Sequence, residues 1–343
     1  LVADRVAVTG ATGVVGGAAA RALLARGDEV VAVQRGAISP ELDSQGAIER
    51  RADIAGSSDV LVEAFTGCQA VVHAAARVEI TGPWEEFERI NVLGTRRVID
   101  AARRAGVGRF VLVSSPSVAH AGDPLIGAQA EPADPAHARG HYSRSKAMSE
   151  VVALADDDGR MAVTILRPHL VWGPGDSQLT ERIVDRARSG RLVTIGAGSA
   201  LIDTTYIDNA GTAIAAAVDR AALPQVRGRA FVVSNGEPRT VSEMLTRIAR
   251  AAGAPGPSRS VPFPVARVGG QVLERLWERT GREGEPPVTA FLAEQLATAH
   301  WFDQRQTREA LAWAPEVTLD EGFVRLAAAM GGVAPPGAAD RGL

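Results

Sequence analysis

The amino-acid sequence predicts an α/β fold: a doubly wound parallel sheet followed by a smaller, mostly helical C-terminal lobe. Three observations lead to this class. A glycine-rich segment at residues 9–16 stands between an apolar strand and an alanine-rich helix. Short, fully apolar runs, as strands buried on both faces require, then alternate with helical patterns as far as residue 167. The alternation ends at Pro168, and the pattern beyond it is irregular.

This pattern divides the chain. Residues 1–167 are expected to form the sheet domain, joined by one strand that returns to the sheet near residues 230–234. The smaller lobe is expected from residues 168–229 and 235–330. Residues 331–343 are rich in Gly, Ala and Pro and are expected to form a loosely held tail.

Composition excludes several classes of protein. The 343 residues are 46% apolar and 22% charged, as in a soluble globular enzyme, and the net charge of −3 contains no block of like charge that would indicate a nucleic-acid partner. Cys68 is the only cysteine, so no internal disulfide forms, which fits a cytoplasmic protein. No signal-peptide pattern precedes the first strand, and no uncharged run approaches the roughly 20 residues of a membrane span. We therefore expect no integral membrane segment.

The first strand-to-helix turn carries the strongest motif, Thr-Gly-Ala-Thr-Gly-Val-Val-Gly at residues 9–16. Gly10 permits a sharp turn, Gly13 lets backbone approach a phosphate, and Gly16 lets the helix at residues 14–26 lie against the strand. That helix points its N–H groups at the turn, which favours an anion such as a dinucleotide pyrophosphate. An ordinary structural turn is the alternative, but the strand before and the helix and second strand after favour a Rossmann cofactor site. The expected contacts are Gly10, Thr12, Gly13, Val14, Val15 and Gly16.

The end of the second strand bears on the choice of cofactor. Proteins that prefer NAD place Asp or Glu here, where a carboxylate holds the ribose 2′-hydroxyl and repels a 2′-phosphate. This chain has neutral Gln34 followed by cationic Arg35. The pair favours NADP(H), with Arg35 as the partner of the 2′-phosphate. The alternative is that Arg35 is a solvated residue at a strand end.

Later strand ends supply further expected contacts. Asp53 and Ile54 follow the third strand, where a carboxylate can accept from the adenine amino group. The fourth strand begins at residue 70 and ends in the small residues Ala74, Ala75 and Ala76, which let backbone pass close to the cofactor. His73 stands alone in that apolar run, so we interpret it as a hydrogen-bonded core histidine. Asn91 lies within a long helix predicted over residues 84–105, where a buried amide can brace neighbouring backbone.

The catalytic candidates are Ser115, Tyr142 and Lys146. Tyr142 and Lys146 stand four residues apart, hence one turn apart on one face of the helix predicted over residues 142–155. A free phenol has a pKa near 10, and a nearby ammonium lowers it, so Tyr142 can exchange a proton with a carbonyl or alcohol. Lys146 can also donate to the nicotinamide ribose. Ser115 follows a strand over residues 110–113, at the sheet edge where ligands bind, and its hydroxyl can hold the substrate oxygen.

Further motifs accompany these: the strand end at residues 73–76, Ser114-Ser115, Arg167-Pro168 and Tyr206-Ile-Asp208. Together with the glycine turn and Tyr-x-x-x-Lys they resemble the extended short-chain dehydrogenase/reductase family over nearly the whole chain. The segment Arg-Pro-His-Leu-Val-Trp-Gly-Pro-Gly-Asp at residues 167–176 resembles its 3β-hydroxysteroid dehydrogenase-like branch. That branch contains the bacterial 2-alkyl-3-oxoalkanoate reductases of long-chain olefin biosynthesis, which reduce a β-keto acid with NADPH beside a β-lactone synthetase and a β-lactone decarboxylase.

The resemblance carries the family's catalytic serine onto Ser115, its acid-base tyrosine onto Tyr142 and its lysine onto Lys146. It implies that the backbone after Pro168 contacts the nicotinamide carboxamide, which gives Pro168, His169 and Val171 as cofactor contacts, with His169 as a shaping residue. It also implies an apolar keto substrate, a homodimer through the helices at residues 84–105 and 142–155, and assembly with β-lactone pathway enzymes.

Other functions are less consistent with the sequence. Dehydratases of the family follow the catalytic Ser/Thr with Asp-Glu, whereas Ser115 precedes Pro116-Ser117, and epimerases carry an acid where Arg35 stands. A dihydroflavonol-type or 3β-hydroxysteroid-type enzyme stays open. A catalytically silent NADP-sensing regulator would not need Ser115, Tyr142 and Lys146. His137 and His141 lie in a loop around a helix start and are interpreted as incidental, so no metal site is expected.

One helix of the smaller lobe, expected over residues 265–280, has a conspicuous apolar pattern. Val268, Val272, Leu273, Leu276 and Trp277 could share a face. Such a stripe is more often core or lid packing; the alternative is a surface that meets a membrane or an apolar substrate.

Overall fold

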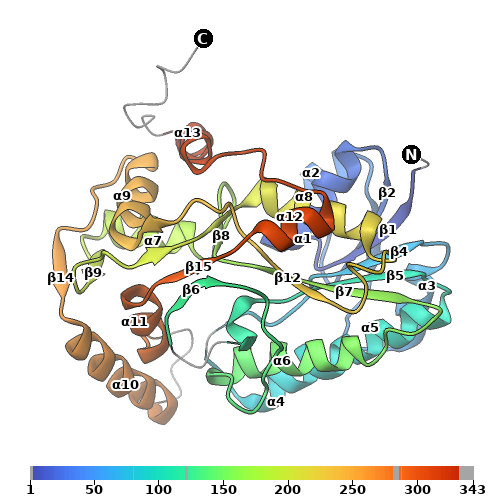
Figure 1. The fold of residues 1–343 in the computed structure, drawn as a ribbon, viewed down its shortest axis with the longest axis horizontal. Helices are drawn as coiled ribbons and strands as arrows, with labels where there is room; N and C mark the ends of the chain where they lie inside the picture. Colours follow the sequence, from blue (N-terminus) through green and yellow to red (C-terminus); the bar gives the residue numbers. More distant parts are fainter. Residues whose placement is uncertain (1–2, 80, 120–122, 281–285, 287, 332–343) are drawn as a thin grey trace.

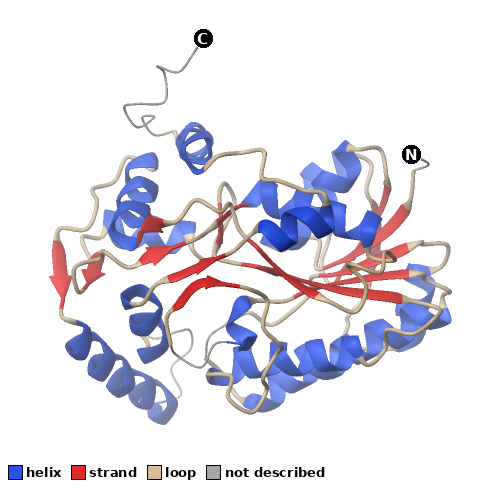
Figure 2. Cartoon of the chain, in the orientation of Figure 1, coloured by secondary structure: helices blue, strands red, loops and turns tan. Residues whose placement is uncertain are grey.

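The computed structural model describes residues 3–79, 81–119, 123–280, 286 and 288–331. Its centre is a seven-stranded, wholly parallel sheet in the order β12-β7-β5-β4-β1-β2-β3, with helices on both faces (Figures 1 and 2). The order reverses after β3, because β4 returns to pair with the other side of β1. The predicted doubly wound α/β class is therefore confirmed. The strands are β1 (Arg5–Thr9), β2 (Glu29–Gln34), β3 (Ile48–Arg51), β4 (Ala70–His73), β5 (Arg109–Val113), β7 (Ala162–Pro168) and β12 (Ala230–Val233).

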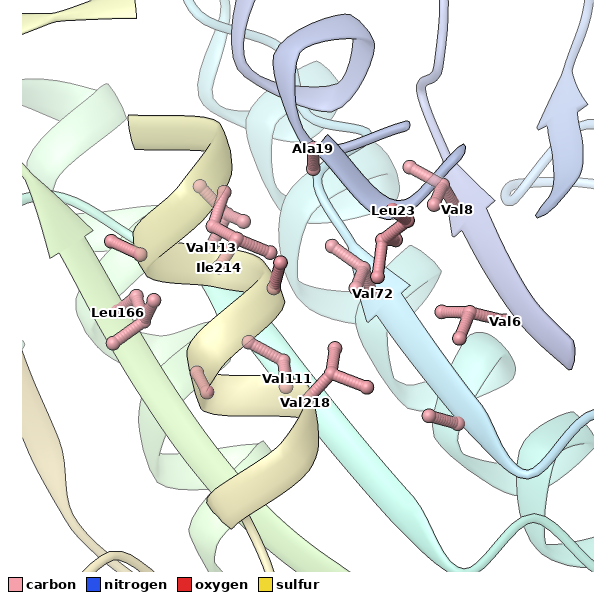
Figure 3. Packing of buried hydrophobic residues seen from close by; sticks show 14 of the residues in the cluster. Val6, Val8, Ala19, Leu23, Val72, Val111, Val113, Leu166, Ile214 and Val218 are labelled. Atoms are coloured by element: carbon pink, nitrogen blue, oxygen red, sulfur yellow. The ribbon is translucent and has the colours of Figure 1, made fainter. Parts of the chain in front are cut away.

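One face of the sheet is covered by α1 (Val14–Ala25) and α8 (Ile207–Arg220), flanked by α2 (Pro40–Ser44) and α12 (Arg305–Leu311). Figure 3 shows Leu23 of α1 together with Ile214 and Val218 of α8 lying over the valines of β1, β4 and β5. The two helices cross closely, since a Cβ at Gly211 would stand 2.4 Å from the carbonyl oxygen of Ala18. Small residues therefore let α1 and α8 share the narrow space above the central strands.

The other face is covered by α3 (Ser58–Phe65), α5 (Leu93–Arg104) and α6 (Gly140–Leu154), whose apolar stripes close a second core. The helix predicted over residues 84–105 is present but interrupted. It consists of α4 (Trp84–Phe87), a π-helical turn over Glu88–Val92 and α5. The π turn contains Asn91, whose side chain hydrogen-bonds three groups described below, and this anchoring accounts for the extra residue in the turn.

The C-terminal lobe contains α7 (Thr180–Arg188), α9 (Val241–Ala251), α10 (Phe263–Thr280), α11 (Ala290–Ala297) and α13 (Leu319–Met330). Short strands that sequence analysis did not anticipate tie these helices together. They are β6 (Leu125–Ala128), β10 (Leu201–Ile202), β13 (Arg239–Thr240) and β15 (His300–Phe302) in one sheet, and the pairs β8 (Val171–Trp172) with β11 (Thr205–Tyr206) and β9 (Val193–Ile195) with β14 (Arg259–Val261). A turn of 3₁₀ helix covers Pro116–Ala119.

The polar segment between Ser115 and Tyr142 holds one of these strands, β6, which pairs with β15 from far along the chain. The lobe has a core of its own, in which Trp172 stacks on Phe323 with ring centroids 4.5 Å apart and packs edge-on against Tyr206. Residues 332–343 of the expected tail lie outside the described residues. Among the helices that the structure describes, none is long and apolar enough to span a membrane.

Candidate active site

A cavity of about 1610 Å³ opens at the carboxyl ends of the central strands, between the sheet and the C-terminal lobe. It gathers the predicted site residues from seven separate segments of the chain, as expected for the ligand edge of an open parallel sheet. His169 is the one predicted contact that does not line it. The predicted residues that line the cavity are Gly10, Thr12, Gly13, Val14, Val15, Gly16, Arg35, Asp53, Ile54, Ala74, Ala75, Ala76, Ser115, Tyr142, Lys146, Pro168 and Val171.

The glycine turn is shaped by contacts that only glycine permits. Gly10 has φ +71° and donates its N–H to the Val33 carbonyl at 2.8 Å, and a Cβ on it would lie 2.8 Å from the Cα of Ala75. A Cβ on Gly16 would lie 2.2 Å from the carbonyl oxygen of Gly10. The helix that follows has neither a side-chain cap nor an acid in its first turn. Its N–H groups and dipole thus face the cavity uncompensated, which fits a dinucleotide pyrophosphate.

The end of β2 presents no carboxylate to the cavity. Gln34 is buried, and neither its Oε1 nor its Nε2 has a hydrogen-bond partner among the described residues. Arg35 beside it is exposed, and Arg21 of α1 lies along the same wall. The neutral amide of Gln34 therefore leaves this end of β2 without a negative charge beside the cavity. Sequence analysis identified Gln34 as neutral but did not assign it a contact.

Asp53 and Ile54 line the same cavity just after β3, the strand that pairs with β2. The Asp53 carboxylate accepts the Ala55 N–H at 2.8 Å, so it also holds its own turn. Ile54 packs against α5, where a Cβ on Gly94 would approach its Cδ1 to 3.1 Å. Both side chains keep contact with the cavity. They are therefore placed to border an adenine ring while shaping the backbone.

At the other end of the cavity α6 presents Tyr142 and Lys146 one turn apart, and the end of β5 presents Ser115. The Ser115 hydroxyl hydrogen-bonds the Tyr142 phenol and lies 3.0 Å from Ser117 Oγ. Lys146 is buried and donates from Nζ to the Val113 carbonyl at 2.6 Å. Ser115, which follows β5, thus lies beside the two candidates of α6 at one end of the cavity.

The electrostatics differ from the expectation for the phenol. Burial raises the pKa of Tyr142 to about 12, and the hydrogen bond from Ser115 opposes this only in part. Burial also lowers the pKa of Lys146 to about 8, with the Glu150 carboxylate opposing. The ammonium is directed at the Val113 carbonyl and is not among the groups that act on the phenol. In the structure described here Lys146 therefore does not lower the pKa of Tyr142, as sequence analysis had expected it to.

Asn91 braces the site as predicted. Its Oδ1 accepts the Arg77 N–H at 2.7 Å, and its Nδ2 donates to the Arg77 carbonyl and to Ser145 Oγ of α6 at 2.8 Å. Its own carbonyl accepts from Thr95 Oγ1 at 2.5 Å and from Ser149 Oγ at 2.8 Å. The π turn, the strand end after β4 and the catalytic helix are thus fixed to one another through one amide.

His73 continues this network toward the glycine turn, as a buried, hydrogen-bonded core histidine. Its Nε2 lies 3.1 Å from Thr95 Oγ1, whose proton is already given to the Asn91 carbonyl, so Nε2 carries the hydrogen. Its Nδ1 then accepts from Thr9 Oγ1 at 2.7 Å, and that oxygen in turn accepts the Ala75 N–H. Burial and the Lys146 charge lower the pKa of His73 to about 3, which keeps the ring neutral.

Behind the catalytic helix lies a buried ion pair. Arg167 at the end of β7 contacts both Glu150 carboxylate oxygens, at 2.9 and 2.6 Å, and both side chains are 1% exposed. Its remaining nitrogen donates to the Glu131 carbonyl at 2.6 Å. The pair fixes α6 to the sheet one turn beyond Lys146. Arg167 of the Arg-Pro motif therefore positions α6, and with it Tyr142 and Lys146, without lining the cavity itself.

His169 faces away from the cavity. Its Nδ1 lies 2.5 Å from the Asp203 carbonyl oxygen and its ring packs edge-on against Phe302, while its backbone N–H donates to Val233. His169 does not line the cavity, and its ring shapes the lobe, as sequence analysis expected; the backbone contact of this segment with a cofactor stays a prediction. Leu170 turns the chain back with φ +43°, a conformation rare outside glycine, and so directs itself and Val171 to the cavity.

Sequence analysis did not assign several further parts of the lining, among them residues 77–79, 174–178 and 206–208. Asp176 accepts backbone N–H groups from Gln178, Leu179 and Thr180 and thereby begins α7. The Pro-Gly-Asp sequence at residues 174–176, which is typical of a turn before a helix, was the feature of the sequence that could have indicated this segment. Within the described residues no cluster of His, Cys, Asp and Glu suits a metal ion.

A parallel sheet with this glycine turn, and a serine, tyrosine and lysine gathered at its carboxyl edge, define an extended short-chain dehydrogenase/reductase. The chain belongs to the 3-beta hydroxysteroid dehydrogenase/isomerase family, which matches residues 7–265. It is an oxidoreductase acting on hydroxyl or keto groups. The predicted family and enzyme class are thereby confirmed.

Two relatives cover almost the whole chain. It is 40% identical over 327 residues to the 2-alkyl-3-oxoalkanoate reductase of Stenotrophomonas maltophilia (strain K279a), covering 94% of this chain and 98% of that one. It is 33% identical over 332 residues to the 2-alkyl-3-oxoalkanoate reductase of Shewanella oneidensis, covering 94% and 85%. Among solved structures, MoeE5 in complex with UDP-glucuronic acid and NAD has a TM-score of 0.69 at 25% identity, covering 96% and 99%.

Proposed function

We propose that the protein uses NADPH to reduce a 2-alkyl-3-oxoalkanoate to the 2-alkyl-3-hydroxyalkanoate. The observation that carries the proposal is the meeting of Ser115, Tyr142 and Lys146 at one end of a cavity whose other end holds the glycine turn. Similarity to two reductases named for this substrate, at 40% and 33% identity, supports the substrate class.

Each residue has a part in this reaction. The reduced nicotinamide supplies the hydride to the carbonyl carbon. Tyr142 gives its phenolic proton to the carbonyl oxygen, and Ser115, already hydrogen-bonded to the phenol, donates to that oxygen as negative charge develops. Lys146, held beside Val113, donates to the nicotinamide ribose hydroxyls and supplies positive charge near the phenol once the ligand is bound. The ketone gains one hydride and one proton and leaves as a secondary alcohol.

We infer that NADP(H) is preferred over NAD(H). Support comes from the absence of a carboxylate at Gln34, from the exposed cation Arg35, and from Arg21 on the same wall. A 2′-phosphate would meet the exposed Arg35 guanidinium and that of Arg21, which also contacts Glu41 at 3.4 Å.

The test is oxidation of NADPH and of NADH, followed at 340 nm with a 2-alkyl-3-oxoalkanoate, a 3-oxosteroid, a dihydroflavonol and a UDP-sugar. Preferred turnover of the β-keto acid with NADPH is expected. Replacing Arg35 by Ala should raise the KM for NADPH at least tenfold and leave that for NADH nearly unchanged, since one charged hydrogen-bonded contact contributes about 1.5–3 kcal/mol. Preferred turnover of the steroid would instead support the hydroxysteroid reaction that names the family.

We also propose a homodimer through α5 and α6. Leu93 on α5 and Val151 on α6 are 40% and 52% exposed, and the two helices pack side by side, so they offer an apolar face to a second copy. The alcohol product would be a substrate for β-lactone formation, and assembly with the enzymes of that pathway belongs to the same proposal.

A further inference from the structure

The outer face of α10 is apolar, and no other described part of the chain covers it. Val265, Val268, Val272 and Leu276 are 61%, 58%, 56% and 44% exposed, and their spacing of three and four residues aligns them along one side of the helix. The apolar stripe predicted from the sequence therefore consists of two groups of side chains, one facing the lobe and one facing outward. Leu273 and Trp277 are half-buried, whereas Val268, Val272 and Leu276 point outward. Core packing accounts only for the inward half.

The inward half of α10 is already packed. Ala266 and Gly270 are buried, and a Cβ on Gly270 would stand 2.5 Å from the backbone nitrogen of Ala290 in α11. Glu274 accepts the same Ala290 N–H at 3.1 Å. Figure 1 shows α10 at the lower rim of the lobe, away from the central sheet, with α11 on its inner side. The exposed stripe is thus a second face, distinct from the one that holds the helix in place.

The same outer face carries positive charge. Arg279 follows Leu276 by three residues and continues the stripe, and Arg275 borders it; both are exposed. In the described part of the chain neither guanidinium pairs with a carboxylate. Glu274 lies on the opposite side of the helix. An apolar stripe edged by two exposed arginines complements an anionic lipid surface.

The α10–α11 pair is also tied to the catalytic helix. Glu294 of α11 forms ion pairs with Arg267 of α10, at 3.2 Å, and with Arg139, the residue before α6 begins. A surface bound by α10 would therefore lie close to the substrate end of the molecule. This position suits an enzyme whose keto substrate is apolar and partitions into lipid.

We propose that α10 is a docking helix that binds the surface of an anionic lipid bilayer through Val265, Val268, Val272, Leu276, Arg275 and Arg279. The apolar side chains enter the boundary between headgroups and acyl chains, while the arginines contact lipid phosphates. The docking needs no substrate, so it stands or falls separately from the proposed reaction.

Flotation of the full-length protein with vesicles tests the proposal. The protein should float with vesicles of phosphatidylglycerol and phosphatidylcholine in equal parts, should stay behind with phosphatidylcholine alone, and should release as NaCl is raised. Replacing both Val268 and Val272 by Asp should weaken binding at least tenfold, and Arg275→Gln with Arg279→Gln by about fivefold for each arginine.

Val60→Asp is the matched control, because Val60 is 44% exposed on α3, far from α10 in the fold. It should float like the wild type. All variants should keep the wild-type unfolding midpoint and the wild-type rate with a short, water-soluble β-keto acid. The proposal is overturned if the wild type ignores anionic vesicles, or if the Val268, Val272 double variant floats unchanged. It is equally overturned if that variant only dissociates an oligomer, which would make the face a protein interface.

Discussion

Among single residues, Tyr142 bears most of the proposed chemistry. A pKa of about 12 keeps its phenol protonated throughout the neutral range, as a proton donor to a ketone requires. The neighbouring Ser115 hydroxyl is in place to share the substrate oxygen. A protonated phenol suits the proposed reduction, in which Tyr142 gives its proton to the ketone oxygen.

Replacing Tyr142 by Phe should lower kcat by about 10²- to 10⁴-fold, because it removes only the proton donor. The Kd for NADPH, measured by fluorescence titration, should stay within about twofold. Tyr206→Phe removes the same oxygen from the other tyrosine of the chain, which packs in the core of the lobe against Trp172. That variant should retain most of the activity. Equal losses in both would contradict the role given to Tyr142.

His73 predicts a pH dependence of stability. Its pKa is about 3 in the folded chain, below the usual 6.5, so the unfolded chain binds one more proton as pH falls below about 6.5. Stability from this group is present above that pH and is lost between about 6.5 and 3. The loss between pH 7 and pH 5 should be about 2 kcal/mol.

Urea unfolding at the two pH values measures this loss. His73→Asn should be less stable than the wild type at pH 7, because the contacts to Thr9 and Thr95 are weakened, but its stability should change less with pH. His137→Gln, at an exposed histidine, should keep the dependence of the wild type. An unchanged pH dependence in His73→Asn would show that folding does not lower the pKa of this ring.

At the scale of secondary structure, the buried pair of Glu150 and Arg167 joins a helix to a strand. Glu150→Gln leaves the guanidinium buried without a full charge partner, which should cost about 3–5 kcal/mol in the free energy of unfolding. Asp158→Asn breaks an exposed pair with Arg103 and should cost less than about 1 kcal/mol. Denaturant titration compares the two. Similar losses would mean that the buried pair is compensated by water or by rearrangement.

Two adjacent glycines of α10 allow a second comparison, this time between two positions of one helix. A Cβ at Gly269 would meet nothing within 4 Å, so Gly269→Ala should stabilise the protein by up to about 1 kcal/mol through helix propensity. At Gly270 the same methyl group would collide with the backbone of Thr289 and Ala290, so Gly270→Ala should destabilise by about 1–3 kcal/mol. Thermal unfolding of both variants measures the difference. A loss of stability in Gly269→Ala would mean that another part of the protein packs against that side of α10.

At the scale of the whole molecule, the proposed dimer can be measured directly. Val151→Glu places a charge on the exposed apolar face of α6 and should convert the dimer to a monomer in light scattering after size exclusion. Val60→Glu, on α3, should leave the mass unchanged. A monomeric wild type would rule out the α5–α6 interface.

Much of this architecture could be predicted because the evidence is local. The glycine turn, the alternation up to Pro168 and the Tyr142, Lys146 spacing each occupy a short stretch of sequence. The small sheets could not be predicted, because strands of two to four residues such as β8, β10 and β6 have no readable period and form through distant partners. The orientation of the His169 ring could not be predicted either, because it depends on Asp203 and Phe302, which are distant in the sequence.

The pairing of β6 with β15 has a consequence for biosynthesis. The segment between Ser115 and Tyr142 is held by a strand that ends at Phe302, so the loop connecting two catalytic candidates has its partner only when nearly the whole chain has been made. On the ribosome, the sheet can assemble as its strands emerge, whereas this loop waits for the C-terminal part. A nascent or truncated chain ending before residue 300 would then bind nucleotide at its glycine turn without being able to turn over a ketone.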